Sequence, residues 1–230
     1  ANNLSVSNVA LTAPNSTSNT IKVQFDISWE NSWRNSTNRD AAWVFIKYST
    51  DSGTTWAHAT LKTAGTDPSD TSAGTGTAVN IIVPADKKGA FIERSANGDG
   101  TTTITEVQLT WDYGADGLAD NDIARVKVFG LEMVYVPTAA FSAGDGSSTS
   151  SFQQGSGDTD SWAVSGPGAI SVTNTASNGY YDGGSAYTIP AEFPEGYAAF
   201  YLMKYEITQG QYMDFLNTLT RAQQVNRVAS

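Results

Sequence analysis

Residues 21–29, IKVQFDISW, alternate apolar and polar side chains over nine positions. Successive side chains of a β-strand point to opposite faces, so this pattern predicts a strand with one face in a core. Residues 43–48, WVFIKY, are apolar on both faces and predict a central strand. Residues 107–111 alternate again. Strands at this spacing, separated by Gly, Asp, Asn and Ser clusters, predict a β-sandwich domain over residues 1–133.

The remaining residues, 134–230, predict a smaller α+β region. Its one clear helix begins near Thr208, where Thr208 and Gln211 form the T-x-x-Q pattern of a capping box. An apolar stripe at helical spacing follows and predicts a core or interface face: Tyr212, Phe215, Leu216 and Leu219. The polar stretches 64–78 and 142–161 predict loops. The expected fold class is mainly β, an N-terminal β-sandwich followed by this region.

Charge and composition exclude several partners. The chain of 230 residues carries a formal net charge of −10 and has a pI near 4.4. Binding to phosphate or anionic lipid needs clustered Lys and Arg, so we expect no nucleic acid and no anionic membrane surface as partners. No apolar run is long enough to span a bilayer. Cysteine is absent, which excludes disulfides and zinc–thiolate sites.

The surface composition points to a compartment. Charged residues make up only 16% of the chain, and Ser, Thr, Gly and Asn take their place. Such a surface is common in secreted β-proteins. The opening Ala1-Asn2-Asn3 fits the end left by signal-peptide cleavage, although a trimmed chain would look the same. We therefore expect an extracellular or cell-surface location.

Two segments carry a family resemblance. Residues 132–137 (EMVYVP), followed by Phe141 and 144–146 (GDG), form the first, and residues 198–212 (AAFYLMKYEITQGQY) form the second. They resemble the opening hairpin and the strand-into-helix segment of the formylglycine-generating-enzyme family, also called the sulfatase-modifying-factor domain. The resemblance implies a partial domain of that family over the second region, with a divergent insert between the two segments.

The resemblance does not extend to the chemistry of that family. There, oxidation of a substrate cysteine depends on a cysteine pair, with copper, late in the domain. This chain has no cysteine, so neither catalytic residues nor a copper site carry over. We expect a protein that is not an enzyme. A fragment of an active enzyme, whose cysteines are encoded downstream, is the competing interpretation.

An acidic loop at residues 111–122 is a candidate Ca²⁺ site. Ca²⁺ takes six to eight oxygen ligands, and the loop offers four carboxylates: Asp112, Asp116, Asp120 and Asp122. The spacing is not that of an EF-hand, because no Glu closes the loop. The alternative is a polar turn between two strands, with Asp-Gly as its corner.

Other residues invite separate interpretations. Asn3, Asn15 and Asn35 match the N-x-[ST] acceptor pattern for glycosylation, against the alternative of an unmodified polar surface. His58 is the only histidine, and without a Cys nucleophile we expect it to be structural. Trp33 lies in a polar stretch and is expected to be exposed, whereas Trp29 is expected in the core.

The N-terminal segment suggests a function. Residues 4–11 form a modest strand ahead of a flexible stretch, with four apolar side chains as a candidate interface: Leu4, Val6, Val9 and Leu11. Such a strand can leave its own domain and pair with a neighbour's sheet edge, and head-to-tail contacts of this kind build filaments. We expect a non-catalytic structural subunit whose partners are copies of itself. The alternative is a glycan- or protein-binding module of a larger cell-surface protein.

Overall fold

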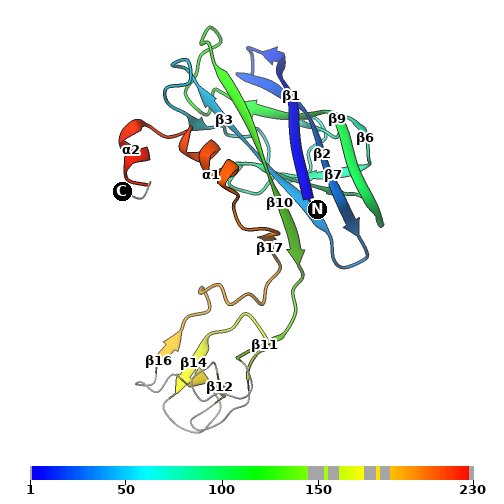
Figure 1. Ribbon diagram of the computed structural model, residues 1–230, viewed down its shortest axis with the longest axis vertical. Coiled ribbons are helices and arrows are strands. Elements are labelled where there is room, and N and C mark those ends of the chain that lie inside the picture. The colour runs from blue at the N-terminus through cyan, green and yellow to red at the C-terminus, as the bar shows by residue number, and fades with distance from the viewer. Residues whose placement is uncertain (1, 145–152, 155–160, 174–179, 182–186, 228–230) are drawn as a thin grey trace. The chain divides into compact units, whose positions relative to one another are not determined.

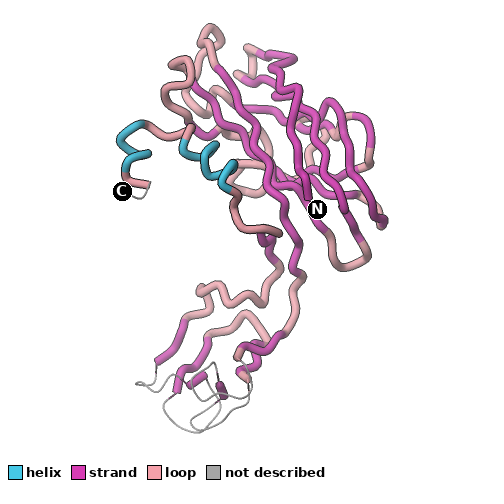
Figure 2. Tube along the Cα trace, viewed as in Figure 1, coloured by secondary structure: helices cyan, strands magenta, loops and turns pink. Residues whose placement is uncertain are grey.

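A computed structural model describes residues 2–144, 153–154, 161–173, 180–181 and 187–227 (Figures 1 and 2). The protein is mainly β, as its sequence predicts. Its contacts divide the chain into two compact units, Ala1–Val134 with Leu202–Ser230 and Tyr135–Tyr201. The chain leaves the first unit after Val134, next to the domain boundary expected after residue 133. The last segment, expected in the second domain, groups with the first.

Two sheets build the described part of the first unit, and we call them sheet I and sheet II. Sheet I has the order β1-β2-β9-β5, with β6 also paired to β9: Asn2–Asn15 (β1), Thr20–Arg34 (β2), Gly98–Asp112 (β9), Thr71–Ser72 (β5) and Thr75–Gly76 (β6). Sheet II has the order β17-β10-β3-β8-β7, with β4 paired to β3: Phe200–Met203 (β17), Arg125–Val136 (β10), Asp40–Ser49 (β3), Ala90–Arg94 (β8), Val79–Ile82 (β7) and Ala57–His58 (β4). The loop expected over 64–78 thus contributes β5 and β6.

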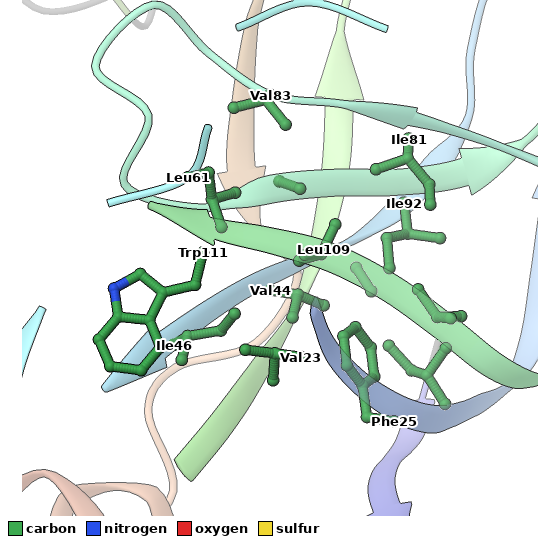
Figure 3. Packing of buried hydrophobic residues seen from close by; sticks show 14 of the residues in the cluster. Val23, Phe25, Val44, Ile46, Leu61, Ile81, Val83, Ile92, Leu109 and Trp111 are labelled. Atoms are coloured by element: carbon green, nitrogen blue, oxygen red, sulfur yellow. The ribbon is translucent and has the colours of Figure 1, made fainter. Parts of the chain in front are cut away.

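Side chains of both sheets meet in one apolar core, which gives the unit a β-sandwich-like architecture (Figure 3). Val23 and Phe25 of β2 are fully buried, and so is Leu109 of β9. They pack in the same cluster as Val44 and Ile46 of β3. Burying a side chain of this kind stabilises the fold by about 1.5–3 kcal/mol. The period-two pattern of residues 21–29 therefore identified the inner face of β2 correctly.

β1 is the edge strand of sheet I, and its pairing with β2 is irregular. The register between the two strands shifts three times. Each shift contains a residue with a left-handed backbone: Asn3 (φ 55°), Asn8 (φ 52°) and Ala13 (φ 45°). An extra residue at a β-bulge is left unpaired and breaks the ladder locally. β1 is therefore held by fewer ladder pairs than its length would allow.

Two short helices follow β17 near the end of the chain. α1 (Gln209–Leu216) starts where the sequence predicts, because the Thr208 hydroxyl accepts from the Gln211 N–H and the Gln211 side chain accepts from the Thr208 N–H. A second capping box begins at Thr220 and opens α2 (Arg221–Val225), so the apolar stripe does not continue along one helix. No residue of either helix is buried. The stripe is therefore not a core face in this chain.

The second unit contains two small sheets in its described part. β11 (Phe141–Ala143) pairs with β13 (Trp162–Val164). The other sheet has the order β12-β15-β14-β16: Gln153–Gln154 (β12), Tyr180–Tyr181 (β15), Ile170–Thr173 (β14) and Tyr187–Ile189 (β16). Most of the loop expected over 142–161 lies outside the described residues.

Candidate functional site

Asp116 in the acidic loop is a hydrogen-bond acceptor within the chain. Its carboxylate accepts from the Thr60 N–H at 2.8 Å, from Thr60 Oγ1 at 2.6 Å and from Trp111 Nε1 at 2.7 Å. Trp111 is 2% exposed and belongs to the core, so its indole N–H needs such an acceptor. Asp116 therefore fastens the loop to one end of the core.

The other three carboxylates of this loop also have donors within the chain. Asp112 and Asp122 accept from backbone N–H groups of their own loop at 3.0 and 2.8 Å. Asp120 accepts from the Tyr113 hydroxyl at 2.5 Å, and this bond raises the pKa of Tyr113 to about 12. Across the described residues no three His, Asp or Glu side chains gather as a metal site requires. The polar-turn interpretation accounts for these contacts, and the Ca²⁺ site stays a prediction.

The three candidate glycosylation sites differ in geometry. Asn15 and Asn35 are exposed, and each uses its side-chain oxygen to accept from two backbone N–H groups, at 3.0 and 3.2 Å for Asn15 and at 2.8 and 2.7 Å for Asn35. These bonds do not use the amide nitrogen, the atom that carries an N-linked sugar. Asn3 instead donates its amide nitrogen to Glu30 Oε2 at 2.9 Å. The amide nitrogens of Asn15 and Asn35 are therefore better placed to carry an N-linked sugar than that of Asn3.

His58 packs against neighbouring side chains, and Trp33 is exposed. The His58 ring stacks on Phe45 with centroids 5.5 Å apart, and a ring nitrogen contacts the Lys88 carbonyl oxygen. Burial lowers the pKa of His58, which favours the neutral ring. This packing fits a structural role. Trp33 is 39% exposed, whereas Trp29 is fully buried, as their sequence contexts predict.

The candidate interface strand, β1, packs against its own unit. Leu4 and Val6 contact the core, while Val9 and Leu11 are 39% and 37% exposed. Leu4 Cδ2 lies directly over Gly130 of β10, where an added Cβ would be only 2.4 Å away. Within a single chain, β1 is therefore an edge strand, and its N-terminal half packs on the core and against Gly130 of β10.

A groove of about 380 Å³ lies beside β10 in the first unit. Its apolar lining comes from β1, β3, β10 and α1 and includes Leu4, Val6, Phe45, Phe129, Leu131 and Phe215. The rings of Phe45 and Phe129 stack with centroids 5.2 Å apart. Lys47 and Asp214 add polar groups, and burial lowers the pKa of Lys47. An apolar groove with few polar groups is typical of a binding site.

The backbone of β10 is open along this groove. β3 pairs with one side of β10 from Arg125 to Val134. On the other side β17 pairs with β10, and Lys204, the residue after β17, donates its N–H to the Glu132 carbonyl oxygen at 2.9 Å. Within the described chain no strand pairs with that side of residues 125–131. This edge therefore presents N–H and C=O groups that an added strand can pair with.

The sequence alone did not identify this groove. Two local signals were present. Residues 43–48 are apolar on both faces, and α1 has an apolar stripe; both indicate that another segment packs on the outer face of sheet II. The meeting of β1, β10 and α1, however, depends on contacts between residues far apart in the sequence.

Comparisons with protein-family models, with curated proteins and with solved structures found no match. In the described part of the chain, no helix combines the length and apolarity that crossing a membrane requires.

Proposed function

We propose that this chain is a non-catalytic, extracellular structural subunit that assembles head to tail with copies of itself. In this proposal β1 of one copy leaves its own sheet and pairs with a sheet edge of the next copy. The observation that carries the proposal is the state of β1. It lies at a sheet edge, is interrupted by three bulges, and is joined to β2 by the largely exposed polar turn at residues 16–19.

The composition of β1 favours transfer between copies. No residue before Lys22 has a charged side chain, so moving β1 into a neighbour desolvates no side-chain charge. A strand that pairs again in a neighbour regains main-chain hydrogen bonds and apolar contacts there. Exchange of an identical element is accordingly a low-cost route to assembly.

Exposed apolar side chains in the last segment of the chain also support assembly. Leu202, Ile207 and Met213 are 56%, 52% and 57% exposed. Exposed apolar side chains are a feature of sites of protein–protein contact where they form one patch. Such a surface suits a subunit better than an isolated monomer.

A reversible lock on β1 tests the proposal. Ser5 and Ser28 lie directly opposite each other in the β1–β2 ladder, and the chain has no cysteine of its own. The double variant Ser5→Cys/Ser28→Cys can therefore form one disulfide, at a spacing that antiparallel strand pairs allow. We expect the oxidised monomer to stay dispersed and the reduced form to build regular particles, seen by negative-stain electron microscopy and sedimentation velocity.

The matched control locks two strands that the proposal leaves together. Ser28 is also opposite Thr103 in the β2–β9 ladder, so Ser28→Cys/Thr103→Cys places a disulfide one strand further in. We expect this variant to assemble in both redox states. If the β1–β2 lock assembles as well as this control, β1 is not the exchanged strand. If the unmodified chain stays dispersed, with and without a Ca²⁺ chelator, the assembly proposal itself fails.

A glycan-binding module is the second candidate. The exposed indole of Trp33 supports it, because aromatic side chains with exposed area serve as contact surfaces for ligands. A dispersed monomer that binds on a glycan array, and loses that binding in Trp33→Ala, would favour this candidate over assembly.

A further inference from the structure

We infer that the groove along β10 accepts β1 of a second copy as an added strand of sheet II. This inference rests on the proposed exchange of β1 and names the edge that receives it. The acceptor site consists of the open edge at residues 125–131 of β10 and the apolar groove beside it, which α1 and β1 flank (Figure 1).

The described sheet edges of the first unit are not equally suited to receive a strand. β10 pairs with β3 over ten consecutive positions without a register shift, so its backbone is regular. The outer edge of β1 is broken by bulges and by Pro14, two features that prevent edge-to-edge pairing. β5 and β6 have two residues each, and β7 has four. Residues 125–131 therefore form the longest regular edge on which a strand of another copy can pair.

The groove and β1 match in chemistry. Strand addition needs main-chain hydrogen bonds along an edge and apolar positions for alternate side chains of the added strand. Leu4 and Val6 alternate with serines in β1, and Val9 and Leu11 flank a single alanine. The groove supplies the aromatic rings of Phe45, Phe129 and Phe215. Because β1 has no charged side chain, it brings no charge of its own into this lining, whose charged groups are Lys47 and Asp214.

The chain's own β1 gives a direct indication of this fit. Leu4 and Val6 already line the same groove from the side of sheet I. Gly130 lets Leu4 approach the backbone of β10, since an added Cβ there would lie 2.4 Å from Leu4 Cδ2. Once a copy's own β1 has left, Leu4 and Val6 of a second copy can restore these apolar contacts in the groove.

A peptide of residues 2–12, NNLSVSNVALT, carrying a fluorophore, measures the acceptor directly. The receiving chain is the oxidised Ser5→Cys/Ser28→Cys variant, whose own β1 cannot leave β2. Binding of the peptide to this locked chain, measured by fluorescence anisotropy, must then occur at another edge. We expect saturable binding, and none for a peptide of the same composition in which the apolar residues no longer alternate with polar ones.

Two substitutions on α1 locate the binding within the groove. Phe215 lines the groove and is 40% exposed, whereas Met213 is 57% exposed and does not line it. Phe215→Asp places a charge in the groove, and we expect it to weaken peptide binding by about tenfold or more. Met213→Asp makes a comparable change on the same helix and should leave binding within about twofold. Both variants are compared by circular dichroism to verify that they fold alike.

The possible results separate this inference from the proposed function. Loss of both peptide binding and assembly in Phe215→Asp, with Met213→Asp unaffected, supports the β10 acceptor. If Phe215→Asp assembles like the unmodified chain, or if the peptide binds only the reduced form, the acceptor lies elsewhere and the inference is overturned while assembly stands. A disulfide ladder between chains of the Ser5→Cys/Ser28→Cys assembly would likewise show the neighbour's β1 on β2, against the inference.

Discussion

At the scale of single residues, the position of β1 depends most directly on the contact between Leu4 and Gly130. Gly130 has no Cβ, and Leu4 Cδ2 occupies the space where one would be, at 2.4 Å. Gly130→Ala should therefore push Leu4 and the start of β1 away from β10. We expect a loss of about 1–2 kcal/mol in the free energy of unfolding, measured by urea denaturation.

A double variant separates this contact from a general effect of Gly130→Ala on the strand. Leu4→Ala removes the side chain that overlaps the new methyl group, so Gly130→Ala should cost less in the Leu4→Ala background than in the unmodified chain. A coupling of about 1 kcal/mol between the two positions is expected for side chains in direct contact. Additive effects would mean that Leu4 does not fill the space over Gly130.

Individual residues could be placed from the sequence where their immediate surroundings decide their environment. Trp29 follows the alternation of a strand and is buried, whereas Trp33 lies among polar residues and is 39% exposed. The role of Asp116 could not be derived in this way. Its partner Thr60 is 56 residues away, and only folding brings the two together.

At the scale of single elements, β1 is fastened to sheet I through Asp26 of β2. The Asp26 carboxylate accepts from Asn8 Nδ2 at 2.6 Å and from the Glu106 N–H at 2.8 Å. These two bonds hold the pKa of Asp26 below its ordinary value, and the bond from Asn8 has the larger effect. A lowered folded-state pKa means that this stabilisation is complete above the unfolded-state pKa, roughly 3.9, and is lost as pH falls through the folded-state pKa.

Acid should therefore loosen the pairing of β1. Asp26→Asn should lower the thermal midpoint at pH 7, and the difference from the unmodified chain should shrink as the pH falls below about 4. Thermal unfolding followed by circular dichroism from pH 2 to pH 7 measures this. In an Asn8→Ala background the effect of Asp26→Asn should be smaller, because the main partner is gone. A difference between the two chains that does not vary with pH would contradict this role for Asp26.

Elements with local signals were predicted, and those without were not. The alternation of residues 21–29 and the capping box at Thr208 each depend on neighbours in the sequence; the inner face of β2 and the start of α1 are as expected. The bulges of β1 depend on how it meets β2, so no pattern within β1 indicated them. The break between α1 and α2 has a local signal of its own, a second T-x-x-Q pattern at Thr220.

For the whole molecule, the sequence predicted the mainly-β class but not the groove beside β10. That groove is lined by residues from β1, β3, β10 and α1 and from the segments beside α1, so its lining runs from Leu4 to Thr218 in the sequence. Taken alone, the sequence of residues 125–131 in β10 predicts an ordinary strand. Only the topology, in which the residue after β17 bonds to β10 at Glu132, leaves residues 125–131 without a second partner strand in the described chain.

The net charge of the whole molecule determines how assembly should respond to salt. Copies of a chain with a formal charge of −10 repel each other at long range, while the proposed contact joins an uncharged strand to an apolar groove. Salt shortens the range of the repulsion, from about 30 Å at 0.01 M to about 10 Å at 0.1 M, and has little effect on apolar contacts at these concentrations. Assembly followed by sedimentation velocity should therefore increase over this range. A decrease with salt would indicate that ion pairs hold the copies together, and an uncharged β1 could not be the strand that joins them.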